Sequence, residues 1–180
     1  MTMDAQTAHI GVRPRYLVIM GVSGTGKTTI ASGLATRLGW RFQEGDALHP
    51  PANVEKMSAG QPLTDTDRAP WLALCHEWLR AQVEAEQGAV LTCSALKRAY
   101  REQLAGEGLP IEFVHIDTSA DALAERLKRR EGHFMPASLL PSQLATLEVP
   151  GDDEPVIRVS GEKHPDLVLE ELIRHFQAED

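Results

Sequence analysis

The octapeptide Gly21-Val22-Ser23-Gly24-Thr25-Gly26-Lys27-Thr28 constrains this chain more than any other part of its sequence. It fits the pattern G-x-x-x-x-G-K-[ST], in which glycines let the backbone turn so that successive N–H groups point at phosphate oxygens. The apolar run Tyr16–Met20 precedes it and predicts a buried parallel strand. Apolar residues at helical spacing continue to Leu38 and predict a helix, whose N-terminus favours an anion. The sequence therefore predicts a phosphate-binding loop (P-loop).

Each residue of this loop has an expected role. Lys27 is expected to contact the β- and γ-phosphates of ATP as a point charge, and the Thr28 hydroxyl is expected to join the shell of Mg²⁺. The other expected contacts of ATP are Gly21, Val22, Ser23, Gly24, Thr25, Gly26 and Thr29. The alternative is a glycine-rich connector that fits the pattern by chance, and the flanking strand and helix argue against it. The loop alone does not name a reaction, because motors, switches and small-molecule kinases share it.

Strand-like and helix-like segments alternate along the rest of the chain. Further strands are expected at 40–44, 89–93, 111–116 and 156–159, and helices within 49–60 and at 67–87, 95–104, 120–130 and 165–177. This alternation predicts an α/β fold with a parallel five-stranded sheet covered by helices on both faces. The length of 180 residues fits one domain over 15–180, and residues 1–14 are expected to form a disordered tail.

The composition excludes several classes of function. The net charge of −8 and the pI near 5.4 argue against non-specific binding to nucleic acid or to an anionic membrane surface. No apolar stretch is long enough for a membrane helix, and the N-terminus lacks the layout of a signal peptide. Cys75 and Cys93 stand in no pairing or metal-binding motif and are expected to be reduced thiols. We therefore expect a cytoplasmic protein.

Asp46 is the strongest candidate for chemistry outside the loop. It follows the second predicted strand, at the carboxyl edge where ligands of open α/β sheets bind. Such a carboxylate can hold Mg²⁺ or accept a proton from an attacking hydroxyl, and the alternative is a helix N-cap. The third predicted strand ends Thr92-Cys93-Ser94 without an acidic residue. We therefore expect Asp46 to replace the Mg²⁺ carboxylate that is missing there.

Arg126, Arg129 and Arg130 have the spacing of one helix face just before Gly132. Because like charges at this spacing repel, we expect some of them to meet an anion, such as the γ-phosphoryl group in transfer. The segment of about 131–150 carries glycine and proline near its ends and is predicted to be a lid that excludes water. The alternative is an ordinary surface excursion.

A set of further motifs is more specific than the P-loop. They are Gly45-Asp46-x-x-His49-Pro50, Asn53, Lys56-Met57, Gly60-x-Pro62-Leu63-x-Asp65-x-Asp67-Arg68-x-Pro70-Trp71, Cys93-Ser94-Ala95-Leu96-Lys97, Tyr100-Arg101, Gly132-His133-Phe134-Met135, Ser142-Gln143, Thr146-Leu147-Glu148 and Pro150. Together they resemble the gluconate kinase family over about residues 16–150. The resemblance implies ATP-dependent phosphorylation of D-gluconate to 6-phospho-D-gluconate, which feeds the pentose phosphate pathway. It also implies a fold like nucleoside monophosphate kinases with a mobile lid, and a homodimer.

A gluconate site needs donors for the hydroxyl groups and a fixed cation for the carboxylate. The planar fork of arginine makes Arg68 or Arg101 better candidates than Lys97 for the carboxylate. Lys97 and Arg101 also fit a solvated helix face, because they are four residues apart. His49 is a candidate donor to a hydroxyl group. The resemblance adds Lys56 and His133 to the substrate set, and it favours Arg126 and Arg130 over Arg129 as catalytic arginines.

Two other functions are compatible with a P-loop in a chain of this size. One is a different small-molecule kinase of this fold, acting on shikimate or a nucleotide, and the motif from His49 to Arg68 argues against it. The other is a nucleotide-dependent regulatory protein without turnover. The intact set of Lys27, Thr28 and Asp46 argues against this second function.

Overall fold

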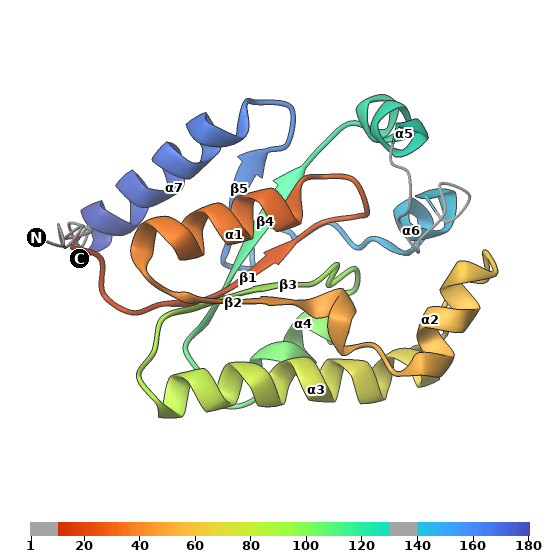
Figure 1. The fold of residues 1–180 in the computed structure, drawn as a ribbon, viewed down its shortest axis with the longest axis horizontal. Helices are drawn as coiled ribbons and strands as arrows, with labels where there is room; N and C mark the ends of the chain where they lie inside the picture. Colours follow the sequence, from red (N-terminus) through yellow and green to blue (C-terminus); the bar gives the residue numbers. More distant parts are fainter. Residues whose placement is uncertain (1–10, 130–139) are drawn as a thin grey trace, which may run out of the picture.

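The computed structural model describes residues 11–129 and 140–180. Its strands form one parallel sheet in the order β2-β3-β1-β4-β5 (Figure 1). They are β1 (Tyr16–Met20), β2 (Arg41–Glu44), β3 (Ala89–Thr92), β4 (Ile111–Asp117) and β5 (Val156–Ser160). In the centre, Ile19 of β1 is in register with Thr92 of β3 and with Val114 of β4. The prediction of a parallel five-stranded sheet is confirmed.

Helices cover both faces of this sheet (Figure 1). One face carries α1 (Lys27–Leu38) and α7 (Pro165–Glu179), and the other carries α3 (Asp65–Glu84) and α4 (Arg98–Ala105). The remaining helices are α2 (Pro51–Ser58), α5 (Ala120–Lys128), α6 (Leu140–Thr146) and the short 3₁₀ helix η1 (Gly45–Leu48). Figure 1 shows α2, α5 and α6 beyond the carboxyl ends of the strands, where the loops of a parallel sheet form binding sites.

The central strand explains the two-layered core. Leu17 and Ile19 of β1 belong to the apolar cluster under α1 and α7, whereas Val18 and Met20 belong to the cluster under α3 and α4. All four side chains are fully buried. Because successive side chains of a strand point to opposite faces, an unbroken apolar run is the pattern that a sheet covered on both faces requires.

Two helices begin at residues that differ from the prediction. α3 begins at Asp65 instead of Asp67, because the Thr64 and Asp67 side chains form a reciprocal capping box. α4 begins at Arg98 instead of Ala95, because Ala95 has a φ of 49° in the left-handed region, which an α-helix excludes. α6 lies within the segment predicted as a lid, where the sequence pattern predicts no helix. Local capping and backbone geometry therefore set these boundaries.

The fold extends into the segment predicted as a tail. Residues 1–10 lie outside the described residues, but the backbone N–H of Arg13 donates to the Asp180 carboxylate at 2.7 Å. Val12 packs against the apolar cluster under α7. Val12 and Arg13 therefore contact the folded part of the chain. No helix in the described part of the chain has the length and apolarity needed to cross a membrane.

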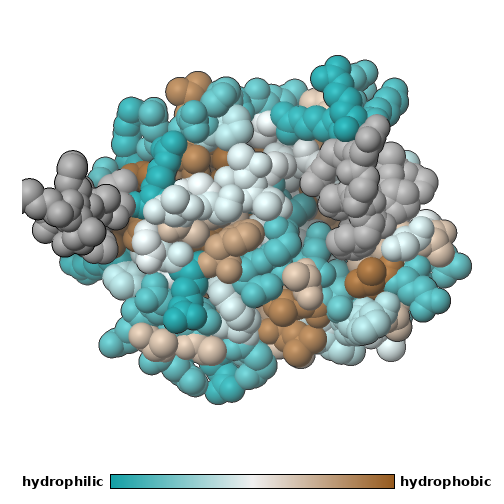
Figure 2. Space-filling model, viewed as in Figure 1, coloured by the Kyte–Doolittle hydropathy of each residue, from teal (hydrophilic) through white to brown (hydrophobic). Residues whose placement is uncertain are grey.

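The described surface exposes four large apolar side chains, namely Phe42, Leu74, Val149 and Leu167. They come from β2, α3, the segment after α6, and α7. On the face drawn in Figure 2, hydrophobic areas are separated by hydrophilic ones. Scattered apolar residues of this kind are normal on a protein surface and do not mark a binding face.

The contact between β2 and β3 at Gly45 gives the first prediction. A Cβ atom on Gly45 would lie 1.9 Å from the carbonyl oxygen of Thr92, so alanine forces the backbone at the end of β2 to move. We expect Gly45→Ala to lower the free energy of unfolding by about 2 kcal/mol or more, measured by urea denaturation. The control is Gly33→Ala, whose Cβ meets only the flexible Leu169 side chain, and equal losses in both variants would contradict this account.

Candidate active site

The P-loop joins β1 to α1 and lines the larger of two cavities. Gly24 and Gly26 have φ values of 89° and 96°, in the region that favours glycine, and Gly26 caps α1. The cavity has a volume of about 690 Å³, within the usual range for small-molecule sites. Residues 23–29 all line it. The backbone N–H groups at the start of α1 therefore face a space large enough for a nucleotide.

Gly21 and Val22 do not line either cavity, although both were predicted to contact ATP. Their carbonyl oxygens instead accept hydrogen bonds from Lys27 Nζ at 2.9 and 3.0 Å. Val22 is buried against the core. These two residues therefore hold the lysine at the floor of the loop, and the other seven predicted residues form the lining.

Glu44 is a site residue that the sequence analysis missed. Its carboxylate accepts hydrogen bonds from Thr28 Oγ1 at 2.8 Å and from Thr92 Oγ1 at 2.6 Å. It lines the nucleotide cavity together with Asp46. The available signal was the pair Glu44-x-Asp46 at the end of β2, because both carboxylates follow from that strand reaching the carboxyl edge of the sheet.

Part of the wall of the larger cavity is apolar. Its walls come from the end of β4, the turn after β5 and the start of α7, and they include Ile116, Pro165 and Val168. Arg126 spans this region, because its guanidinium donates to the carbonyl oxygens of Gly24 and Gly161. Arg129 lines the same cavity with a largely exposed side chain. Arg130 lies outside the described residues.

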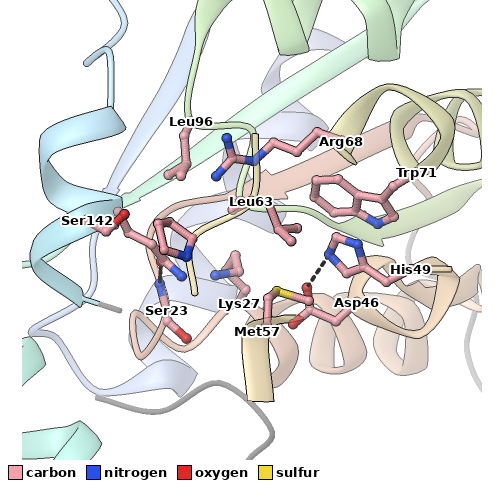
Figure 3. A pocket seen from close by; sticks show the side chains of 13 residues that line it. Ser23, Lys27, Asp46, His49, Met57, Leu63, Arg68, Trp71, Leu96 and Ser142 are labelled. Atoms are coloured by element: carbon pink, nitrogen blue, oxygen red, sulfur yellow. Dashed lines mark hydrogen bonds and ion pairs between the residues drawn. The ribbon is translucent and has the colours of Figure 1, made fainter. Parts of the chain in front are cut away.

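The smaller cavity opens between η1, α2, α3, the segment after β3, and α6 (Figure 3). Its lining residues are Ser23, Lys27, Asp46, His49, Met57, Pro62, Leu63, Arg68, Trp71, Ser94, Leu96, Ser142 and Gln143. Ser23, Lys27 and Asp46 also line the nucleotide cavity. The two cavities therefore meet at the P-loop lysine and the predicted carboxylate. Asp46 lies within η1 and does not cap α2, whose N-cap is Pro50.

His49 is buried at one wall of the smaller cavity. Its ring stacks on Trp71 with a centroid distance of 4.0 Å and an interplanar angle of 17°, and Trp71 Nε1 donates to the Gly45 carbonyl at 2.8 Å. Burial, with a further contribution from the nearby Arg68, lowers the pKa of His49 to about 4. The ring is therefore neutral at pH 7. Its Nε2 lies 3.9 Å from Asp46 Oδ1 (Figure 3).

Arg68 enters the same cavity from α3, and residues outside the cavity orient it. Its guanidinium donates to the Tyr100 hydroxyl at 3.0 Å, and that hydroxyl donates in turn to Asp65. Burial and the Asp65 carboxylate raise the pKa of Tyr100, so the hydroxyl keeps its proton as a donor. The Tyr100 hydroxyl therefore orients the guanidinium, whose charge also acts on Asp65 and His49.

The other cations of the predicted substrate set lie outside both cavities. Lys56 pairs with Asp67 at 2.7 Å and ties α2 to the start of α3. Lys97 pairs with Asp65 at 3.2 Å. Arg101 is 2% exposed and binds Glu154 and the carbonyl oxygens of Ala95 and Glu148. Its donors therefore serve the packing of α4 against the segment after α6. His133 lies outside the described residues.

The described part of the predicted lid contacts the P-loop. Gln143 of α6 accepts a hydrogen bond from the Ser23 backbone N–H at 2.8 Å. Gln143 is also 9% exposed and lines the smaller cavity. Residues 131–139 lie outside the described residues. The predicted lid segment therefore contributes Ser142 and Gln143 to the lining of the smaller cavity.

The carboxylates fit a metal ion that is shared with a phosphate ligand. No cluster of three His, Cys, Asp or Glu side chains that could hold a metal occurs within 11–129 and 140–180. Mg²⁺ in kinase sites is usually held by one or two carboxylates together with substrate phosphates. Thr28, Glu44 and Asp46 line one cavity with the P-loop and supply hydroxyl and carboxylate oxygens, which fits that mode of binding.

The low pKa of His49 predicts a pH-dependent stability. In the unfolded state the His49 ring binds a proton below about pH 6.5, whereas in the folded state it does so only near pH 4. The free energy of unfolding therefore decreases as the pH falls from 6.5 to 4, because the unfolded state binds more protons. We expect the free energy of unfolding of the wild type, relative to His49→Gln, to decrease from pH 7 to pH 4.5 in urea denaturation. A difference between the two proteins that is constant with pH would contradict this expectation.

Comparisons with known proteins agree with this geometry. A family model described as an AAA domain matches residues 17–150. A gluconokinase of Gluconobacter oxydans is 83% identical over 178 residues, which cover 99% of this chain and 100% of the relative. A solved gluconokinase structure from Sinorhizobium meliloti superimposes with a TM-score of 0.82 at 42% identity, covering 93% of this chain and 94% of its own. An unliganded sugar kinase from Janibacter gives a TM-score of 0.84 at 49% identity, covering 89% and 93% of the two chains. This chain belongs to the gluconokinase family of P-loop kinases.

Proposed function

We propose that this protein transfers the γ-phosphoryl group of ATP to D-gluconate and releases 6-phospho-D-gluconate and ADP. The observation that carries the proposal is the meeting of two cavities at Ser23, Lys27 and Asp46. One cavity has the P-loop of a nucleotide site, and the other has a carboxylate, an arginine and polar groups suited to a sugar acid. The names of its relatives in the gluconokinase family support this substrate.

The larger cavity is assigned to ATP. The backbone N–H groups of residues 23–29 and the Lys27 ammonium bind the phosphates, and the wall formed by Ile116, Pro165 and Val168 receives the base. Thr28, Glu44 and Asp46 are the residues that would hold Mg²⁺, and the ion would neutralise phosphate charge. Arg126 lies between Gly24 and Gly161, where its charge stabilises the nucleotide and the transferring group.

The smaller cavity is assigned to gluconate. Arg68 binds the carboxylate, while His49, Ser94 and Ser142 are placed to hydrogen-bond hydroxyl groups. Asp46 accepts the proton of the terminal hydroxyl, and the hydroxyl oxygen forms a bond to the γ-phosphorus. The bond from that phosphorus to the β–γ bridging oxygen breaks, and its electron pair leaves with ADP.

The proposal keeps two residues that the structure does not describe. The family resemblance supports Arg130 as a second arginine near the γ-phosphate and His133 as a lid residue near gluconate. Lys56, Lys97 and Arg101 are assigned instead to the framework around the site, because each pairs with a carboxylate outside the cavities. Lys27, Arg68 and Arg126 are then the cations assigned to anionic ligands.

The proposal also includes the setting of the enzyme. The resemblance to the family supports a homodimer.

Cys75 and Cys93 are buried free thiols, and the contact with the Cys93 thiol together with burial raises the pKa of Cys75. Unreactive, reduced thiols support the cytoplasm as the compartment. The net charge of −8 supports a small-molecule substrate over nucleic acid or an anionic membrane.

The first test is an ADP-release assay with Mg-ATP against D-gluconate, shikimate, glycerate and AMP. We expect turnover with gluconate, and Asp46→Asn is expected to lower kcat at least a hundredfold because the amide cannot accept the proton. ATP binding by the variant, measured by calorimetry, controls for folding. ATP binding without turnover on any acceptor would favour the regulatory function.

The second test concerns the carboxylate of gluconate. Arg68→Gln removes the charge but keeps a donor, and we expect the KM for gluconate to rise roughly 10- to 100-fold with a smaller change in the KM for ATP. Arg98→Gln is the matched control, because Arg98 is an exposed cation of α4 that pairs with Asp153. An unchanged KM for gluconate in Arg68→Gln would remove Arg68 from the substrate site.

A further inference from the structure

The two ring nitrogens of His49 face different partners. Nδ1 lies 3.3 Å from Nδ2 of Asn53, and Nε2 lies 3.9 Å from Asp46 Oδ1. A neutral imidazole carries one proton, so one nitrogen is a donor and the other an acceptor. The identity of the nitrogen that carries the proton decides whether His49 presents a donor or an acceptor to the reaction site.

A second contact of Asn53 determines which nitrogen of His49 carries the proton. Its Nδ2 also donates to the backbone carbonyl of Asp67 at 2.9 Å. A carbonyl only accepts hydrogen bonds, so this contact fixes the amide with its NH₂ group toward Asp67 and His49. One amide hydrogen is used by Asp67, and the other faces Nδ1 of His49. Nδ1 is therefore the acceptor, and the proton of the neutral ring resides on Nε2.

The surroundings of the ring keep it in this orientation. The His49 side chain is 3% exposed and stacks on the buried Trp71, and Asn53 is 5% exposed. Asn53 stands on α2 and Asp67 near the start of α3, and the Lys56–Asp67 ion pair joins the same two helices. The His49 ring is therefore held by the Asn53 amide at its edge and by the Trp71 indole on its face.

We propose that Asn53 is a positioning residue that fixes His49 as an Nε2–H donor facing Asp46. The imidazole then cannot accept a proton from the substrate hydroxyl, and its donor is directed to the Asp46 carboxylate or to the hydroxyl oxygen beside it. The distance of 3.9 Å is longer than a hydrogen bond, as is common for catalytic contacts that shorten only with substrate bound. This inference deepens the proposed function and rests on its assignment of Asp46.

The test uses the full chain labelled with ¹⁵N-histidine and a long-range ¹H–¹⁵N correlation spectrum at pH 7.5, without nucleotide or Mg²⁺. The chain has seven histidines, and His49→Gln identifies the signals of His49 by their loss. We expect an unprotonated Nδ1 and a protonated Nε2 in the wild type. A proton on Nδ1 would overturn the proposal without any variant.

Substitutions at Asn53 test the cause. Asn53→Leu removes both donors, and we expect the His49 nitrogen shifts to move toward the average of the two tautomers. Asn53→Asp offers only acceptors, and we expect the proton on Nδ1. Lys56→Gln is the matched control, because it loosens the same α2–α3 contact without touching His49. Signals of His49 that stay unchanged in both Asn53 variants, or that change equally in Lys56→Gln, would overturn the proposal.

Kinetics separate positioning from packing. We expect the Asn53 variants to lower kcat with gluconate about tenfold, the effect of losing one hydrogen bond, with an unchanged KM for ATP because Asn53 lines neither cavity. A shifted tautomer with unchanged kcat would overturn the positioning role. If the wild type does not phosphorylate gluconate, the proposed function fails, while the tautomer measured by NMR still decides the orientation of His49.

Discussion

The position of β1 at the centre of a parallel sheet is the constraint on which the rest of the site depends. β3 lies on one side of this strand and β4 on the other, so the connections diverge at its carboxyl end. Such a divergence leaves a crevice above the sheet, and the P-loop fills its floor. β2 and β3 end at the same edge, which places Glu44, Asp46 and Ser94 around Lys27. The chemistry of the site therefore follows from strand order.

An acidic protein that binds two anions needs its positive charge concentrated at the site. Lys27 donates to two backbone carbonyls, Arg126 to two others, and Arg68 to a tyrosine hydroxyl. These neutral acceptors help to orient the three cations that line the cavities. Lys56, Lys97 and Arg101 instead pair with carboxylates. Lys27, Arg68 and Arg126 line the cavities, whereas Lys56, Lys97 and Arg101 do not, although all six are basic residues that the sequence singled out.

Neighbouring polar side chains also surround the two carboxylates beside the P-loop, Glu44 and Asp46. Hydroxyl groups of Thr28 and Thr92 fix Glu44, and the buried His49 faces Asp46. His49 is fixed in turn by Trp71 and Asn53, which come from α3 and α2. The surroundings of the Asp46 carboxylate are thereby linked to the packing of two helices. This link explains why the motif extends well beyond the residues that line the cavities.

The sequence by itself determined the parallel sheet, the P-loop and the family, because apolar runs, glycine spacing and contiguous motifs are local patterns. It also identified Asp46, His49 and Arg68, which the structure brings to one cavity. Only the tertiary structure separated Arg68 from Arg101, because both are arginines in family motifs but one lines the smaller cavity and the other is buried beside Glu154. The contacts of Glu44 and Asn53 likewise join them to residues distant in sequence, Thr92 and Asp67. Side-chain partners across elements depend on how the elements pack, which no local pattern records.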